Sequence, residues 1–427
     1  MKAKRVIWLL TGLLVLCTLP AAGGLNAAAE KVVLRMGDNI PDRNSPWGLV
    51  IEEINAEFMR KHPHVEIVTE SLQDQPYQQK IRIYAASNQL PDVFKYWSHP
   101  PLLGPMVEND YIMALNPADY DDMGFVAGSL EVNMYDGKLY GLPTNADFWV
   151  IYYNQRLFEE NKVEVPATMD ELLAAAEVFQ ANGIIPISTM GREGWPLVIT
   201  FDTLVGRYSN DFDIIQKALD REARFTEVPF LQAARKFMEL VNAGLFQADL
   251  LTSDYGAARN LFGQEVAAMH VMGSWELGLS TDTAFSEQFR ENVRAMRFPA
   301  VAGEAGDIDN LSAWFGGNYV VSAQTEHKEL ALDYLDMYFT RYPDLAWEKK
   351  VNIPAQVVRA TDEDGPLAQD LLAILGSAKA TGDPSQDRGT PAFKEAYERL
   401  AQELVAGIKT PEQFVMELDR IAEKYAE

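Results

Sequence analysis

Four tryptophans stand where the chain is expected to turn. Trp97, Trp195, Trp275 and Trp314 lie at the ends of predicted strands or beside glycine turns. An exposed indole stacks on the apolar C–H face of a sugar ring, whereas the sugar hydroxyls need hydrogen-bonding side chains such as Asp, Asn and Glu. The pattern therefore indicates a carbohydrate-binding site. Packing in a core or at a hinge is the alternative for each indole.

Further candidates flank these tryptophans. Trp275 is favoured for ligand contact because Gly273 frees the backbone directly after an apolar strand. Asn145 and Asp147 follow Pro143 and would either bind sugar hydroxyls or brace a hinge. Trp47, just before a helix, would cover a ligand or pack on that helix.

Signatures of catalysis are mostly missing. The chain has no phosphate-binding glycine loop, no His-Glu-x-x-His and no Gly-x-Ser-x-Gly motif. His270 lies inside an apolar strand and is expected to be a core histidine. With 62 acidic residues, however, a carboxylate pair of the kind that glycosidases use remains possible.

The N-terminus predicts export. Basic residues, an apolar run from Val6 to Leu19 and the small residues Ala27 to Ala29 form a signal peptide over residues 1–29. Cys17 follows the bulky Leu16, so it is interpreted as part of the signal, with a lipid anchor as the alternative. The expected location is extracellular or periplasmic. Without the three basic residues of the signal the net charge falls from −25 to −28, which disfavours nucleic acid and anionic membranes as partners.

The mature chain begins with alternating strands and helices. Strands are predicted at Val32–Met36, Val65–Glu70 and Asp92–Tyr96, with helices at Ser45–Lys61 and Asp74–Asn88 between them. This order predicts a mostly parallel sheet, which binds ligands at the carboxyl ends of its strands, where Asn39, Ser71 and Trp97 follow.

A second set of elements follows the segment 137–154. Thr168 and Glu171 predict a capped helix, and strands are predicted at Ile184–Ser188, Val266–Met272, Val293–Pro299 and Gly316–Ser322. Without a low-complexity linker between the two sets, two lobes that each use discontinuous sequence fit the pattern best.

Seven short blocks occur in an order that resembles the family-1 bacterial extracellular solute-binding proteins, which serve sugar importers. The blocks are Leu90-Pro91-Asp92-Val93-Phe94, Gly137–Pro143 with Tyr153-Asn154, Pro166-x-Thr168-x-x-Glu171-Leu172, Ala268-Met269 with Gly273-Ser274-Trp275, Phe298-Pro299, Gly316-Gly317, and Ala331-x-x-Tyr334-Leu335.

The resemblance implies a two-lobed α/β fold like that of the type II periplasmic binding proteins, with a ligand cleft between lobes that close by hinge motion. The N-terminal lobe would comprise residues 30–146 plus 297–345, and the C-terminal lobe residues 147–296 plus 346–427. The resemblance carries binding roles to Trp275, to Tyr96 and Trp97, and to Gly317 and Asn318.

The implied function is that of a monomeric receptor, without catalysis, cofactor or metal, which captures a sugar or oligosaccharide and delivers it to the permease of an ABC transporter. One alternative is a secreted glycosidase or lyase with a carboxylate pair in the same cleft. Another is a receptor for a solute such as a polyol phosphate, for which Arg35, Arg43 and Arg192 are the candidate ligands.

Overall fold

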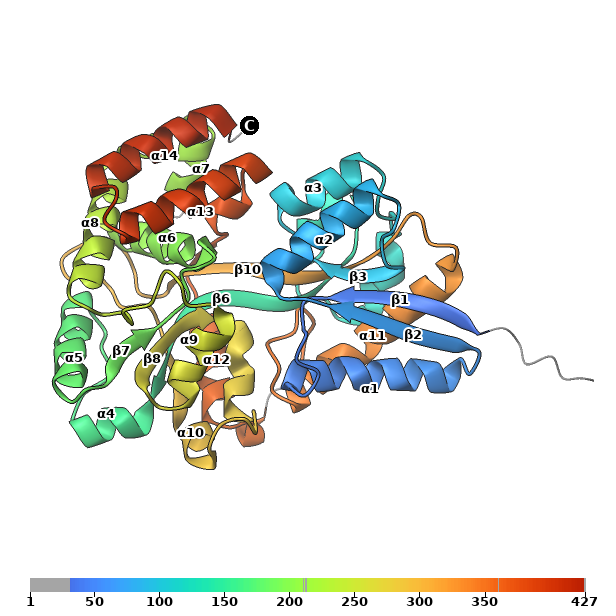
Figure 1. Ribbon diagram of the computed structural model, residues 1–427, viewed down its shortest axis with the longest axis horizontal. Helices are drawn as coiled ribbons and strands as arrows, with labels where there is room; N and C mark the ends of the chain where they lie inside the picture. Colours follow the sequence, from blue (N-terminus) through green and yellow to red (C-terminus); the bar gives the residue numbers. More distant parts are fainter. Residues whose placement is uncertain (1–30, 210, 212, 360, 426–427) are drawn as a thin grey trace, which may run out of the picture.

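The protein has two α/β lobes that lie side by side (Figure 1). The computed structural model describes residues 31–209, 211, 213–359 and 361–425, so the expected signal peptide and Cys17 lie outside the described residues. None of the helices within these ranges combines the length and the apolar composition that a membrane crossing requires.

The N-terminal lobe confirms the predicted alternation of strands and helices. Its strands are β1 (Val32–Asp38), β2 (Val65–Ser71) and β3 (Val93–Tyr96), and its helices are α1 (Pro46–Lys61), α2 (Asp74–Ala86), α3 (Pro100–Glu108) and α11 (Lys328–Glu348). The three strands are parallel. Side chains alternate between the faces of the sheet: Val93 packs with α1 and α11, and Phe94 packs with α2 and α3.

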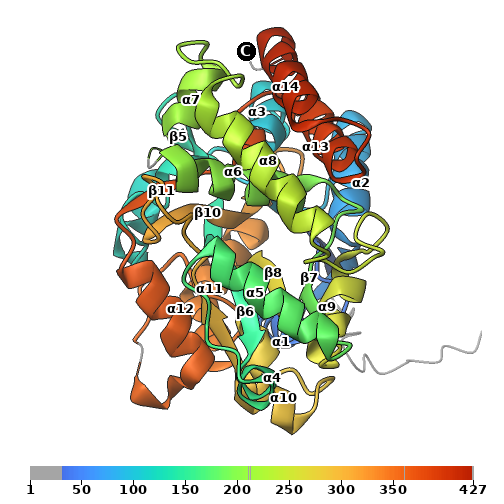
Figure 2. The same ribbon diagram turned by 90° about the vertical axis from the view of Figure 1, so that its left-hand side faces the viewer.

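The C-terminal lobe surrounds the other half of the same sheet, and α5 and α8 cross its outer side (Figure 2). The Thr168–Glu171 capping box predicted for α5 is present. Its strands are β7 (Ile185–Ser188), β8 (Ala267–Gly273) and β9 (Val293–Met296), and its helices are α4 (Gln155–Asn161), α5 (Met169–Ala181), α6 (Trp195–Ser209), α7 (Asp213–Leu219), α8 (Val228–Asn242), α9 (Tyr255–Gly263), α10 (Glu287–Asn292), α12 (Pro366–Gly376), α13 (Pro391–Val405) and α14 (Pro411–Tyr425).

Two long strands belong to both lobes. β6 (Leu142–Asn154) and β10 (Asn310–Val321) pair antiparallel in the middle of the sheet, whose order is β2-β1-β3-β10-β6-β8-β7. The predicted lobe-crossing segment is thus β6, preceded by the hairpin of β4 (Met134–Tyr135) and β5 (Lys138–Leu139). Residues 352–356 form a third crossing beside β6, where the Ala146 amide donates to the Ile353 carbonyl at 2.9 Å.

The strand β10 differs from its prediction because it begins at Asn310 rather than Gly316. Its first half contributes Leu311 and Ala313 to the core of the C-terminal lobe, and its second half contributes Tyr319 and Val321 to the core of the N-terminal lobe. The chain therefore changes lobe within β10. The other domain boundaries stay predictions.

Arg207 fixes the loop that leads into β10. This side chain of α6 is only 1% exposed. Its guanidinium donates to backbone carbonyls of five residues, namely Phe298, Pro299, Asp307, Ile308 and Asn310, over 2.8–3.4 Å. A planar fork of five N–H groups suits such a set of acceptors, whereas an ammonium does not.

We expect Arg207→Lys to lower the free energy of unfolding by about 3 kcal/mol, because several buried carbonyls lose their donor while the charge stays. Chemical denaturation measures this change. Arg60→Lys, at an exposed position of α1, is the matched control and should change stability by less than about 0.5 kcal/mol. Equal effects of the two substitutions would contradict the assignment.

Candidate functional site

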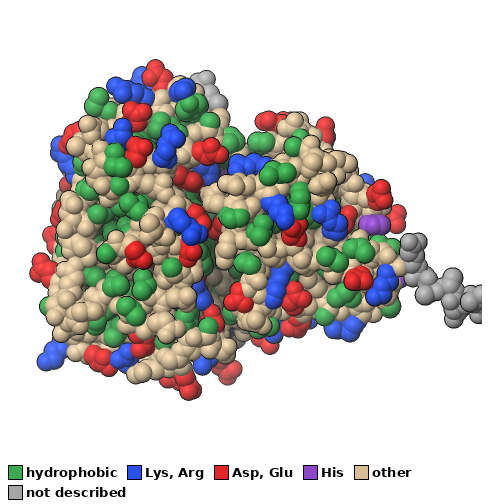
Figure 3. Space-filling model, in the orientation of Figure 1, with side chains coloured by type: hydrophobic (Ala, Val, Ile, Leu, Met, Phe, Trp, Pro, Cys, Tyr) green, Lys and Arg blue, Asp and Glu red, His purple; other side chains and the backbone are tan. Residues whose placement is uncertain are grey.

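A cavity of about 400 Å³ lies between the lobes. On the molecular surface the region where the lobes meet is hollowed (Figure 3). Residues from the N-terminal lobe, the C-terminal lobe and the crossing strands all line the cavity. Nine of the eleven predicted site residues are among them: Asn39, Trp47, Trp97, Asn145, Asp147, Trp195, Trp275, Trp314 and Gly317.

The other two predicted residues, Tyr96 and Asn318, do not line the cavity, which corrects the sequence interpretation. They pair with each other across β3 and β10. Tyr96 packs in the core under α2 and α3, and Asn318 donates to the Tyr140 carbonyl at 3.3 Å. Because side chains alternate along a strand, their neighbours Lys95 and Gly317 reach the cavity instead.

One wall of the cavity is aromatic. The ring centroids of Trp195 and Trp275 lie 5.9 Å apart, as do those of Trp275 and Trp314. Trp149 of β6 lies buried behind them, 5.9 Å from Trp195 and 6.3 Å from Trp275. Trp195 is the first residue of α6 rather than part of a loop, and Trp314 lies inside β10 rather than at its end. Three indoles from different segments thus form one surface.

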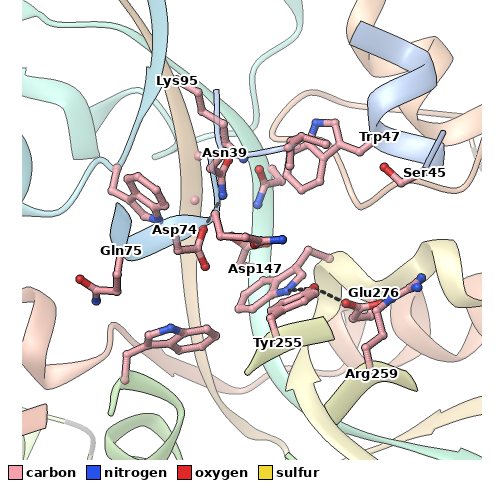
Figure 4. A pocket seen from close by; sticks show the side chains of 18 of the residues that line it. Asn39, Ser45, Trp47, Asp74, Gln75, Lys95, Asp147, Tyr255, Arg259 and Glu276 are labelled. Atoms are coloured by element: carbon pink, nitrogen blue, oxygen red, sulfur yellow. Dashed lines mark hydrogen bonds and ion pairs between the residues drawn. The ribbon is translucent and has the colours of Figure 1, made fainter. Parts of the chain in front are cut away.

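A chain of polar contacts holds Trp275 in place. Its Nε1 donates to the Tyr255 hydroxyl at 3.1 Å, and that hydroxyl donates to Glu276. Arg259, beside Glu276 in Figure 4, donates to that carboxylate at 2.7 Å. It also donates to Asp282 at 2.7 Å. The sequence interpretation missed Tyr255 and Arg259. Their spacing of four residues on the short helix α9, just before the strand that ends at Gly273, is the signal that marks them.

The floor of the cavity is formed by β6 and β10. Trp314 lies opposite Asp147, and Gly316 lies opposite Asn145. A methyl group added at Gly316 would overlap the Asp147 carboxylate, and one at Gly317, whose φ is +58°, would lie 2.8 Å from Asn145 Oδ1. Both glycines therefore permit the close approach of these side chains. Burial raises the pKa of Asp147 to about 7.

The N-terminal lobe contributes a third group of polar side chains. Asn39 donates to Asp74 at 2.6 Å, and burial raises the pKa of that carboxyl. Lys95 of β3 places its Nζ 3.8 Å from the centroid of the Trp47 ring, and burial lowers the pKa of this amine to about 8. Trp47 thus contacts the site as well as packing on the core of α1. Lys95 and Asp74 were not predicted.

The lobes also touch across the cavity. His99, which precedes α3, lies with its Nε2 3.4 Å from Asp387 of the short 3₁₀ helix Ser385–Asp387. Asp387 is also paired with Lys394 of α13 at 2.6 Å. Burial lowers the pKa of His99. Although burial alone would raise it, the charges of His99 and Lys394 lower the pKa of Asp387.

The three arginines considered for an anionic ligand lie outside the cavity lining. Arg35 donates to the Gln89 and Leu90 carbonyls, Arg43 pairs with Asp38, and Arg192 pairs with Asp254. Arg259, the arginine that does line the cavity, is paired with two carboxylates. The arrangement disfavours a phosphate ligand.

A serine and a histidine meet in the C-terminal lobe, away from the cavity. Ser188 Oγ lies 2.9 Å from His270 Nδ1, and both side chains are fully buried. Burial lowers the pKa of His270 to about 4, so the imidazole is neutral at pH 7. The predicted core role of His270 is confirmed, because a substrate has no access to this pair.

His270 makes the stability dependent on pH. Its pKa lies near 6.5 when solvated and near 4 in the folded protein, so between these pH values only the unfolded chain takes up the proton. The free energy of unfolding therefore decreases as the pH is lowered. Relative to His270→Gln, we expect the wild type to lose about 3 kcal/mol between pH 7 and pH 4. Unfolding titrations of both proteins measure this difference, in which Asp147 and other common groups cancel. A difference independent of pH would refute it.

Gly273 determines where the Trp275 ring lies. A methyl group at this position would overlap the indole, although the φ of −78° suits any residue. We expect Gly273→Ala to cost about 2 kcal/mol of unfolding free energy and to change the near-ultraviolet circular dichroism of the coupled indoles. Gly256→Ala is the control, because an added Cβ at this cavity-lining glycine of α9 would meet only Asp254 Oδ1, at an ordinary contact distance of 3.8 Å. An unchanged spectrum for Gly273→Ala would contradict the prediction.

Two named relatives are similar in sequence to part of this chain. A multiple sugar-binding protein of Streptococcus mutans is 26% identical over 247 residues, which cover 53% of this chain and 54% of that protein. An arabinooligosaccharide-binding protein of Halalkalibacterium halodurans is 26% identical over 323 residues, 72% of this chain and 63% of its own length. The matched region thus spans half to two thirds of the length of these relatives.

Solved structures match nearly the whole chain. One, from work on xylan utilization by Caldanaerobius polysaccharolyticus, is 25% identical with a TM-score of 0.85 and covers 91% of this chain and 99% of that chain. A chitin oligosaccharide-binding protein has a TM-score of 0.82 at 22% identity, covering 92% and 99%. The predicted two-lobed α/β fold of the periplasmic binding proteins is confirmed.

The family comparison agrees with the fold and the cavity. The model of the family described as bacterial extracellular solute-binding protein matches residues 44–341, from the start of α1 into α11. This range contains all three indoles of the wall and both crossing strands. The chain belongs to the bacterial extracellular solute-binding protein family.

Proposed function

We propose that this protein is a carbohydrate receptor of an ABC importer. The observation that carries the proposal is the wall of Trp195, Trp275 and Trp314, which faces hydrogen-bonding side chains across a cavity between two lobes. Indoles bind the apolar faces of sugar rings, and the polar groups bind the hydroxyls. The relatives named for multiple sugars and for arabinooligosaccharides support the same ligand class.

Capture requires the lobes to move. The contact between His99 and Asp387 spans the cavity, so a ligand enters when the lobes separate. β6, β10 and residues 352–356 are the connections that would bend. A ligand that touches both lobes stabilises the closed form by its higher affinity for that form. The signal peptide directs export of the protein. Outside the cytoplasm, the closed monomer with its ligand then docks on the permease at the membrane.

Binding without catalysis fits the site better than glycoside hydrolysis. The relatives are named as binding proteins. A glycosidase needs one protonated and one ionised carboxyl group facing the substrate. Here Glu276 is engaged by Tyr255 and Arg259, and burial raises the pKa of both Asp74 and Asp147.

We expect titration calorimetry of the mature protein against neutral mono- and oligosaccharides to find a ligand. Trp275→Ala should weaken its affinity by at least about 10-fold, because a large stacking surface is lost. Trp347→Phe is the control, since this indole packs in the core away from the cavity. Hydrolysis of a sugar in the panel, without stable binding, would favour the enzyme instead.

A further inference from the structure

Lys95 is a cation without a partner inside the cavity. The residue is 4% exposed, and its side chain passes Gly317, where an added Cβ would lie 3.1 Å from Lys95 Cε. Its Nζ lies over the Trp47 ring. Within the part of the chain that the structure describes, no hydrogen bond or ion pair reaches this Nζ. An ammonium with little access to water and no acceptor is costly, so an acceptor from a ligand would stabilise it.

The neighbouring polar atoms are unpaired as well. Asn39 Oδ1, Trp47 Nε1 and Asp147 Oδ1 are buried without a hydrogen-bond partner. The side chains of these residues and of Lys95 line one end of the cavity (Figure 4). By contrast, the opposite wall is already paired, because Arg259 and Lys394 each bind two carboxylates.

The charged groups around Lys95 disfavour a ligand group that carries a net charge. Asp38, Asp74 and Asp147 are close enough to oppose the fall in its pKa, yet none forms an ion pair with it. An anionic group that bound Lys95 would lie near Asp74 and Asp147, and a cationic group that bound Asp147 would lie near Lys95. A hydroxyl both donates and accepts without a net charge. Sugar hydroxyls therefore suit this mixed group of side chains better than a charged group does.

We propose that Lys95 determines specificity, by binding adjacent free hydroxyls of an uncharged sugar unit together with Asp147, Asn39 and Trp47. The proposal rests on the sugar-receptor function proposed above. It adds that the unit at this end of the ligand is neutral and unsubstituted at these hydroxyls. A carboxylate at this end would be buried beside two carboxyl groups that are already removed from water, so sugars that carry one bind more weakly.

The test compares Lys95→Met with the wild type by calorimetry, using the neutral sugar of the panel that binds most tightly. We expect the affinity to fall by about 10- to 100-fold, because charge-assisted hydrogen bonds are lost. The melting temperature of the free variant should stay equal or rise, because methionine keeps the length of the side chain and removes an unpaired buried charge. Lys328→Met, at an exposed site on α11, is the control and should change neither quantity.

The same sugar oxidised to the aldonic acid at its reducing end, and to the uronic acid at its other end, tests the charge selection. We expect at least one acid form to bind the wild type at least about 10-fold more weakly than the neutral sugar. Three outcomes would overturn the proposal: affinity of Lys95→Met within twofold of the wild type, tighter binding of an acid form, or a loss of affinity that accompanies a fall of several degrees in melting temperature. If no sugar binds the wild type, the receptor function itself has failed.

Discussion

Backbone hydrogen bonds between β6 and β10 connect the two lobes and place the cavity between them. The pairing puts Trp314 beside Asp147 and Gly316 beside Asn145, so an aromatic group and two hydrogen-bonding groups share one face of the ladder. A shift of register by one residue would turn all of them away from the cavity. The two glycines are part of this constraint, because a side chain at either position would displace Asp147 or Asn145.

The cavity combines a paired wall with an unpaired end. On the wall, Trp275, Tyr255, Glu276, Arg259 and Asp282 satisfy one another, so the indole is positioned before a ligand arrives. At the other end, among the described residues, Lys95 Nζ has no ion pair or hydrogen bond and Asp147 Oδ1 is unpaired, so both groups are costly to bury. In the proposed receptor this cost would oppose closure around an empty cavity and would be offset when hydroxyls enter. In the proposed receptor, the paired wall would therefore orient the ligand, and the unpaired end would contribute to the free energy of closure.

Features that depend on a local sequence pattern could be predicted from the sequence. Tryptophans after strands, the capping box and the lobe-crossing segment were identifiable because turn residues and hydrophobic periodicity mark them. Lys95 was not, because it lies within a short strand that is buried on both faces, and no local pattern shows which face meets the cavity. Tyr96 and Asn318 were assigned to the site by family blocks that do not specify the face of the strand. The contact between His99 and Asp387 joins residues far apart in the chain, and only the tertiary fold brings them together.

That contact has a property that suits repeated opening. Asp387 keeps Lys394 as a partner within its own lobe, at 2.6 Å, so the loss of His99 does not leave a buried carboxylate unpaired. Ser385, two residues earlier, donates to Asp202 of α6 at 2.8 Å, which anchors this segment to the C-terminal lobe. Burial lowers the pKa of His99, which weakens its electrostatic attraction to Asp387. The lobes therefore meet through a polar contact at a firmly held point, and in the proposed receptor the ligand rather than this contact would supply most of the free energy of closure.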